Sequence, residues 1–291
     1  MKLSEQEFQD IRVLIQKLCG IWLGEDKRYL VKTRLEAVVK GNHFATYAQL
    51  IQQASIASNF RYHDAIVEAI TTKETSFNRD GHPFETFRDF LLPDLIANRI
   101  SRQRAAGLPF GKLRLWSSAA STGQEAYSLA MVISDFLQTQ PTITSKANPL
   151  KFENFSILGT DISAQAIEYA SKGIYSVREL ERGLTVDQKR KYFLESHGNF
   201  TVHSQIKGMV EFKRMDLTKP FVDANSVDFI LCRNLLIYFD ERTRKRVIDE
   251  FVKCLPSGGL LMLGAAESLP SLPQGLLQEQ FGKTTVYRKV H

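Results

Sequence analysis

The first part of the chain carries apolar side chains at helical spacing. Phe8, Ile11 and Ile15 recur three or four positions apart, and Gly20 follows as a typical helix stop. The same pattern predicts further helices over residues 26–40, 46–54 and 62–70. We therefore expect an all-helical N-terminal domain over residues 1–72.

From residue 113 onward, short apolar runs alternate with amphipathic stretches. Strands are predicted over residues 113–120, 155–160, 210–215, 227–232, 260–263 and 284–290. Helices are predicted between them over residues 124–137, 164–172 and 241–255. Strands that alternate with helices build a sheet with helices on both faces. The pattern therefore predicts a doubly wound α/β domain over residues 113–291, joined to the helical domain by a linker and connecting helix over residues 73–112.

One stretch, residues 176–212, interrupts this alternation. It contains a short helical pattern over residues 185–193 and a polar strand pattern near residue 200. We interpret it as a small β insertion at the edge of the sheet. Within it, Phe200–His203 is expected to pair with Val210–Phe212 as a hairpin.

Composition and charge narrow the class of protein only slightly. The 38 basic and 32 acidic residues give a net charge of +6 and a pI near 9.1. This charge suits an acidic protein surface or nucleic acid, and equally an ordinary solvated surface. Three widely spaced cysteines indicate neither a disulfide framework nor a zinc site, so no metal is expected.

The chain has no apolar run long enough to span a membrane, and its N-terminus lacks the apolar core of a signal peptide. A cytoplasmic protein is therefore expected. No large apolar stripe lacks a place in the predicted fold, so we also expect a monomer.

Candidate ligand-binding residues follow the predicted strands, because open α/β sheets bind ligands at the carboxyl ends of their strands. The loop after the first strand contains Gly123 and Glu125. A dinucleotide site would need more glycines, and Glu125 would repel a phosphate. The loop suits a ligand with a cationic centre, such as the sulfonium and ammonium of S-adenosylmethionine, although an ordinary strand-to-helix turn would look similar.

The later strands end in polar residues as well. Asp161 follows the second strand, where a carboxylate can bind ribose hydroxyls or cap the next helix. Asp216 follows the third strand, where the amino group of an adenine would lie. The fourth strand is followed by Arg233, Asn234 and, a little later, Tyr238. Each residue has a packing or capping alternative, but together they predict one binding site.

The segment T-T-K-E-T-S-F-N-R, residues 71–79, lies between the two predicted domains and is unusually rich in hydrogen-bonding groups. With L-W-S-S-A-A-S-T-G-Q-E-A-Y-S-L-A, I-L-G-T-D-I, L-C-R-N-L-L-I-Y-F-D and G-A-A-E-S-L, it resembles the CheR family of chemotaxis receptor glutamate methyltransferases. The motifs follow the family's order and spacing over nearly the whole chain.

The resemblance implies a class I, Rossmann-like methyltransferase fold and S-adenosylmethionine as cofactor. It also implies that residues 71–79 lie over the cofactor. By similarity, the cofactor is bound by Lys73, Thr75, Arg79, Gly123, Glu125, Asp161, Asp216, Leu217, Arg233 and Asn234. Arg79 and Tyr238 are the expected catalytic residues. Lys73 stands where the family usually has asparagine, Asn78 where it has an aromatic residue, and Gln124 and Ala126 where it has Glu and Pro.

The expected partner is the acidic helical methylation region of a membrane chemoreceptor. It would bind the basic second helix through Lys27, Arg28, Lys32 and Arg34. Some family members also bind a pentapeptide at the C-terminus of the receptor through the inserted subdomain. The short connection over residues 204–209 predicts that this chain does not bind such a pentapeptide. Two other readings remain open: a cofactor-binding sensor or adaptor without turnover, and a nucleic-acid methyltransferase. The latter class usually carries Asn/Asp-Pro-Pro-aromatic where this chain has Asn234-Leu235-Leu236-Ile237.

Overall fold

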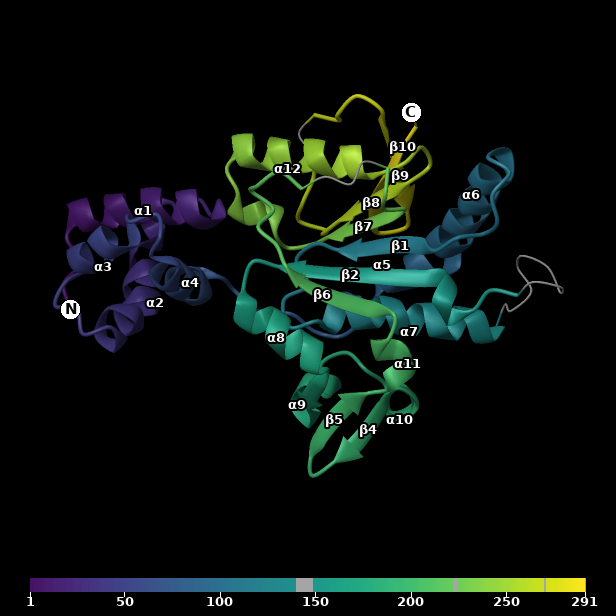
Figure 1. Cartoon of the computed structure of the whole chain (residues 1–291), viewed down its shortest axis with the longest axis horizontal. Coiled ribbons are helices and arrows are strands. Elements are labelled where there is room, and N and C mark those ends of the chain that lie inside the picture. The colour runs from purple at the N-terminus through teal and green to yellow at the C-terminus, as the bar shows by residue number, and fades with distance from the viewer. Residues whose placement is uncertain (140–148, 222–224, 270, 291) are drawn as a thin grey trace.

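The computed structural model describes residues 1–139, 149–221, 225–269 and 271–290. A helical domain lies beside a larger α/β domain, and a small three-stranded sheet projects from the latter (Figure 1). Across these residues, no helix combines the length and the apolar character needed to cross a membrane.

The N-terminal domain is built from four helices, as predicted. They are α1 (Glu5–Cys19), α2 (Arg28–Gly41), α3 (Tyr47–Ala54) and α4 (Phe60–Ile70). Helix α1 begins at a capping box between Ser4 and Glu7 and ends at Gly20, whose φ of 74° is left-handed. The apolar stripe of α1 is buried against the other helices, and a 3₁₀ turn, η1 (Glu25–Lys27), leads into α2.

A helical connection joins the domains. It runs through α5 (His82–Thr86), the π-helical turn η2 (Phe87–Leu91) and α6 (Leu92–Ala105). Arg99 and Arg102 of α6 form ion pairs with Asp228, a buried carboxylate at the start of strand β7. These ion pairs hold helix α6 against the edge of the sheet where strand β7 begins, opposite to the carboxyl ends of the strands.

The central sheet has seven strands in the order β6-β2-β1-β7-β8-β10-β9. Their bounds are β1 (Leu113–Ser117), β2 (Phe155–Asp161), β6 (Val210–Arg214), β7 (Phe229–Cys232), β8 (Leu260–Leu263), β9 (Leu276–Phe281) and β10 (Thr284–Lys289). The first five in the spatial order are parallel, and β10 is antiparallel to both neighbours. The doubly wound fold is confirmed; strand β9 was not predicted.

Helices cover both faces of the sheet (Figure 1). The longer ones in the α/β domain are α7 (Gln124–Thr139), α8 (Ala164–Lys172) and α12 (Glu241–Cys254). Asp240 caps α12 through the backbone N–H of Thr243, as the sequence indicated. The strand order reverses between β1 and β7, so the loops after these strands diverge there and leave room for a ligand.

The small sheet has the order β3-β5-β4 and is antiparallel. Its elements are β3 (Ile174–Ser176), α9 (Val177–Glu181), α10 (Val186–Tyr192), β4 (Phe193–Ser196) and β5 (Asn199–Val202). The predicted hairpin between Phe200–His203 and Val210–Phe212 is wrong. Strand β6 pairs in parallel with β2 of the central sheet, and helix α11 (Ser204–Lys207) occupies the connection.

Candidate active site

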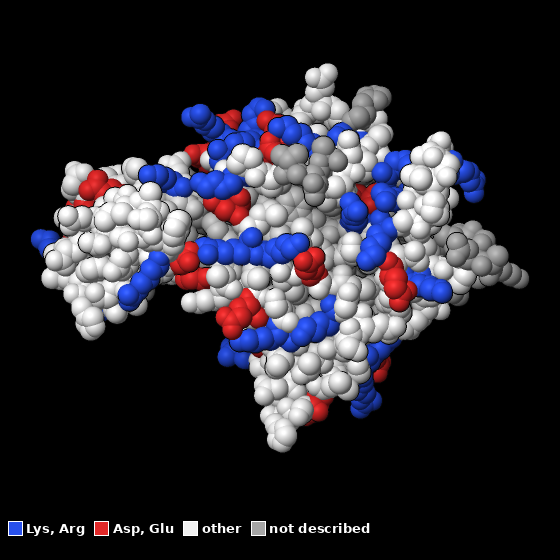
Figure 2. Space-filling model, viewed as in Figure 1, with Lys and Arg blue, Asp and Glu red and all other residues white. Residues whose placement is uncertain are grey.

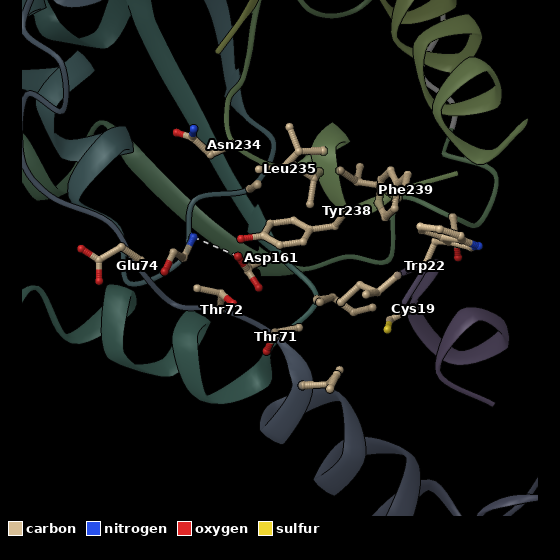
Figure 3. Close-up of a pocket in the computed structure, with 18 of the residues that line it drawn as sticks. Cys19, Trp22, Thr71, Thr72, Glu74, Asp161, Asn234, Leu235, Tyr238 and Phe239 are labelled. Carbon is tan, nitrogen blue, oxygen red and sulfur yellow. Dashed lines mark hydrogen bonds between the residues drawn. The ribbon is translucent and has the colours of Figure 1, made fainter. Parts of the chain in front are cut away.

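A cavity of about 340 Å³ opens at the carboxyl ends of β1, β2, β6 and β7. This size is within the range of about 300–1,000 Å³ found for small-molecule sites. Its other wall is formed by residues 21–24, by Leu30 and Arg34 of α2, and by residues 70–72, Glu74 and Thr75 of the interdomain segment. Figure 3 shows Trp22, Thr71, Thr72 and Glu74 on this wall. The cavity therefore lies between the two domains, beside the point where the strand order reverses.

Most of the predicted site residues line this cavity. They are Thr75, Arg79, Glu125, Asp161, Asp216, Leu217, Arg233, Asn234 and Tyr238. Lys73 and Gly123 are not among the lining residues. The Lys73 ammonium instead binds the Glu68 carboxylate at 2.7 Å, and Gly123, with a φ of 96°, packs against Tyr175 and Phe212. The strand-end rule thus brings together residues from four separate strands.

Asp161 is held by the backbone at the end of β2. One carboxylate oxygen accepts the N–H of Ser121 and the other accepts the N–H of Ser163, each at 2.9 Å (Figure 3 shows the former). Helix α8 is capped by Ser163. Burial raises the pKa of Asp161, while the two backbone hydrogen bonds favour its charged form. Each oxygen keeps a further lone pair that a ligand hydroxyl can use.

Ser121 was not singled out by the sequence, but the structure gives it an unusual position. Its φ of 49° lies in the left-handed region, and its buried hydroxyl has no hydrogen-bond partner among the described residues. The residue lines the cavity. A buried hydroxyl without a partner is costly unless a ligand satisfies it, so Ser121 fits a site that binds a polar cofactor.

Glu125 and Arg233 form a buried ion pair at the base of the cavity. The distance between Arg233 Nη1 and Glu125 Oε2 is 3.3 Å, and the Ser117 hydroxyl donates to Oε1 at 2.8 Å. Arg233 also pairs with Asp80 and donates to the Arg79 carbonyl. Burial raises the pKa of Glu125, and Arg233 opposes this shift. The arginine thereby fixes the segment that carries Arg79.

Glu267 shapes the loop after β7. Its carboxylate accepts the backbone N–H groups of Asn234, Leu235 and Leu236 at 2.6–2.8 Å, and that of Gly264 at 2.9 Å. Asn234 has a left-handed φ of 58°, which these bonds help to hold. The sequence motif contained Glu267 but gave it no role, because its partners are backbone groups that no side-chain pattern reveals.

The segment 71–79 uses its polar groups to bind several elements. Arg34 of α2 donates to Thr72 Oγ1, and Glu74 forms an ion pair with Arg182 beyond α9. The N–H of Asn78 donates to Ser128 Oγ on α7, and its side chain donates to the carbonyl of Gly183. These contacts hold the segment across the cavity, so its dense polarity has a structural use.

Tyr238 lies in the 3₁₀ turn η4 (Leu236–Tyr238), and its ring extends across the cavity toward Asp161 (Figure 3). Its carbonyl accepts the N–H of Trp22 from the N-terminal domain at 2.8 Å. Next to this bond, Ile21 and Phe239 form an isolated antiparallel β-bridge. The N-terminal domain is therefore attached directly to the loop that carries a predicted catalytic residue.

A doubly wound sheet with a single-glycine first loop and acidic strand ends around the cavity indicates an S-adenosylmethionine-dependent methyltransferase. Comparison with known families narrows this class. Residues 73–285 match the family model "CheR methyltransferase, SAM binding domain", and residues 6–59 match "CheR methyltransferase, all-alpha domain". The chain belongs to the CheR methyltransferase family, and its cofactor is S-adenosylmethionine.

Curated relatives agree over nearly the full length. The "Chemotaxis protein methyltransferase" of Vibrio parahaemolyticus is 34% identical over 271 residues, which cover 93% of this chain and 92% of the relative. The "Chemotaxis protein methyltransferase Cher2" of Pseudomonas putida is 32% identical over 289 residues and covers 99% of both chains. The match to the Pseudomonas putida relative spans almost the whole chain and therefore includes both domains.

Proposed function

We propose that this enzyme methylates glutamate side chains of chemotaxis receptors. The observation that carries this proposal is the cavity between the two domains, where Arg79 lies among residues suited to the cofactor. When bound, S-adenosylmethionine supplies a methyl group on a sulfonium. Transfer of this methyl group to a glutamate carboxylate oxygen would give a glutamyl methyl ester and release the neutral thioether S-adenosylhomocysteine.

The protein's part in this reaction is binding and orientation. A glutamate is already ionised at neutral pH, so no general base is needed. We assign Arg79 to orienting the incoming carboxylate, since its planar guanidinium matches one. Its guanidinium donates to the Glu74 carbonyl at 3.1 Å, and no carboxylate of the described residues forms an ion pair with it. Tyr238 would shield the reacting atoms from water.

The remaining lining residues would hold the cofactor. Glu125 suits its ammonium group, Asp161 its ribose hydroxyls and Asp216 its adenine amino group. The Ser121 hydroxyl, which has no hydrogen-bond partner among the described residues, would bind a polar group of the cofactor near Glu125, at the start of α7. We propose no direct cofactor contact for Lys73 or Gly123, since neither lines the cavity.

Incubation with labelled S-adenosylmethionine and receptor-bearing membranes tests the reaction. We expect label in the receptor that is released as methanol by mild base, as methyl esters are. Base-stable label would indicate another acceptor, and cofactor binding without transfer would indicate an adaptor.

Replacing Asp161 with alanine is expected to weaken cofactor binding by about 1.5–3 kcal/mol, the range for losing hydrogen bonds to a charged group. Titration calorimetry measures this directly. The change also frees the N–H groups of Ser121 and Ser163, so thermal unfolding must accompany the titration. Asp161→Asn keeps one acceptor and should be intermediate. Unchanged affinity in a folded Asp161→Ala protein would contradict the ribose assignment.

The basic residues of α2 and η1 divide into two groups. Lys27 and Arg34 line the cavity with Leu30, at spacings of three and four residues on one face. Arg28 lies on another flank, where it pairs with Glu5 and donates to the Leu3 carbonyl. Figure 2 shows basic and acidic side chains mixed where the two domains meet. We propose that Lys27 and Arg34 meet the acidic receptor first, with Lys32 at the margin.

Charge reversal at Lys27 is expected to raise the receptor KM about fivefold at low salt, since a rim charge contributes about 1 kcal/mol or less. Added salt should reduce the difference. Lys27→Glu places an acid at a helix start, where it is tolerated. Lys32→Glu should have a smaller effect. Lys112→Glu, at the opposite end of β1, is the matched control, and an equal effect there would argue against a local contact.

We further propose that binding does not require a receptor pentapeptide. Residues 204–209 form helix α11 and the two residues after it, and are not the hairpin connection that the sequence predicts. Instead, strands β4 and β5 are joined tightly through His197 and Gly198, both with left-handed φ values, which leaves little backbone to close over a peptide. Micromolar binding of a tether-type pentapeptide would contradict this.

A further inference from the structure

The outer part of the cavity is unusually apolar for a solvent-exposed surface. Among the large apolar side chains that the described residues leave exposed, Trp22 and Ile237 are the two that line the cavity. Trp22 is 55% exposed and Ile237 is 48% exposed. Leu30 of α2, which is half-buried, lines the same cavity. We call Trp22, Leu30 and Ile237 the apolar lip.

The apolar lip is built from both domains. Trp22 follows α1, whereas Ile237 belongs to η4 in the α/β domain. The hydrogen bond from Trp22 N–H to the Tyr238 carbonyl joins the two segments at this point. The backbones of Trp22 and Ile237 are therefore held next to Tyr238, whose ring reaches toward Asp161 (Figure 3).

A substrate that reaches this site must bring its backbone close to the lip. A glutamate carboxylate is only a short methylene chain away from its own backbone. On a helix, the residues three and four positions away lie on the same face as the glutamate. These neighbouring substrate residues would therefore contact the protein side chains around the mouth of the cavity when the glutamate enters.

We infer that the apolar lip is a subsite for an apolar side chain of the substrate, one helical turn from the glutamate that is methylated. This inference rests on the proposed function and names a feature of its substrate. Exposed tryptophan surface at the centre of an interface contributes strongly when an apolar partner removes it from water. Lys27 and Arg34 also line this cavity and carry positive charge, with Lys27 paired to the exposed Asp26 at 2.9 Å and Arg34 donating to the Ile70 carbonyl and to Thr72. The preferred substrate helix is therefore acidic as well as apolar on the face it presents.

The test compares truncations of the lip with truncation of an exposed apolar residue elsewhere. Trp22→Ala and Ile237→Ala are expected to raise the receptor KM, by about tenfold for Trp22. The kcat and the Kd for S-adenosylmethionine should change less than twofold. Val13→Ala is the matched control, because Val13 is 68% exposed on α1 and does not line the cavity. Trp22→Phe keeps an apolar ring and should be intermediate.

A second arm changes the substrate. Two helical peptides are compared that differ only four positions from a single glutamate, one with leucine and one with glutamine. The wild-type enzyme should bind the leucine peptide more tightly, and Trp22→Ala should lose the preference. The inference is overturned if both lip variants keep a wild-type receptor KM, or if cofactor affinity falls as much as receptor affinity. Failure of the wild type to form base-labile esters would instead contradict the proposed reaction.

Discussion

Replacing Arg79 with alanine is expected to lower kcat by about 10²-fold, the loss that follows when a reacting group is misplaced by about 1 Å. The reason is geometric. Arg79 lines the cavity, and its guanidinium keeps donors that no carboxylate of the described residues occupies. Its backbone is fixed separately, because its carbonyl accepts a hydrogen bond from Arg233. The side chain can therefore be removed without releasing the segment.

Single-turnover transfer and cofactor titration together decide the role of Arg79. The Kd for S-adenosylmethionine should change little, since the proposed partner is the substrate carboxylate. Arg79→Lys keeps the charge but loses the planar fork, so it should recover only part of the rate. Equal losses of rate and cofactor affinity would indicate that Arg79 binds the cofactor and does not orient the substrate carboxylate.

Replacing Arg233 with methionine is expected to destabilise the fold by about 3–5 kcal/mol, the cost of leaving a buried charge unpaired. The arginine side chain is almost fully buried and pairs with Glu125, which is also buried. Its second partner, Asp80, is half-exposed and can be hydrated, so Glu125 accounts for most of the loss. Urea unfolding at pH 7 measures the change in the free energy of unfolding.

Two comparisons isolate the ion pair. Arg88→Met breaks the exposed pair with Asp89 and should cost less than about 1 kcal/mol. Glu125→Gln combined with Arg233→Met should recover much of the stability. Burial already raises the pKa of Glu125 above 4.5, and without Arg233 it rises further. The single variant should therefore lose stability as pH increases from about 4.5 toward the folded-state pKa. A loss independent of pH and of Glu125 would contradict this account.

Local elements of this fold are predictable because they depend on short-range patterns. The helix-stop glycine at position 20, the cap at Asp240 and the apolar run of β7 are encoded where they occur. Pairing is not local, and this is why β6 was assigned to a hairpin with β5 although it pairs with β2. Strand β9, Leu276–Phe281, lies at the sheet edge, and only three of its six residues are apolar without alternating with the polar ones, so its sequence lacks the apolar signal of a strand.

The candidate site follows a similar division. Asp161, Asp216 and Arg233 were predictable because the carboxyl ends of parallel strands converge at one edge. Glu267 and Ser121 were not, since one acts through backbone N–H groups and the other is recognised only by burial and a missing partner. The two faces of α2 also needed the structure, because the sequence alone does not show which flank turns toward the cavity.

The bridge between Ile21 and Phe239 limits how freely this architecture can be recombined. A chimera could join the first 72 residues of one family member to the catalytic domain of another. The segment equivalent to residues 20–24 would then come from one protein and the loop equivalent to residues 235–239 from the other. The two segments have to be complementary where they pair, because this pairing holds the loop in its conformation. Residues 20–24 and 235–239 would then change in a correlated way among family members, as the parts of a single inherited unit.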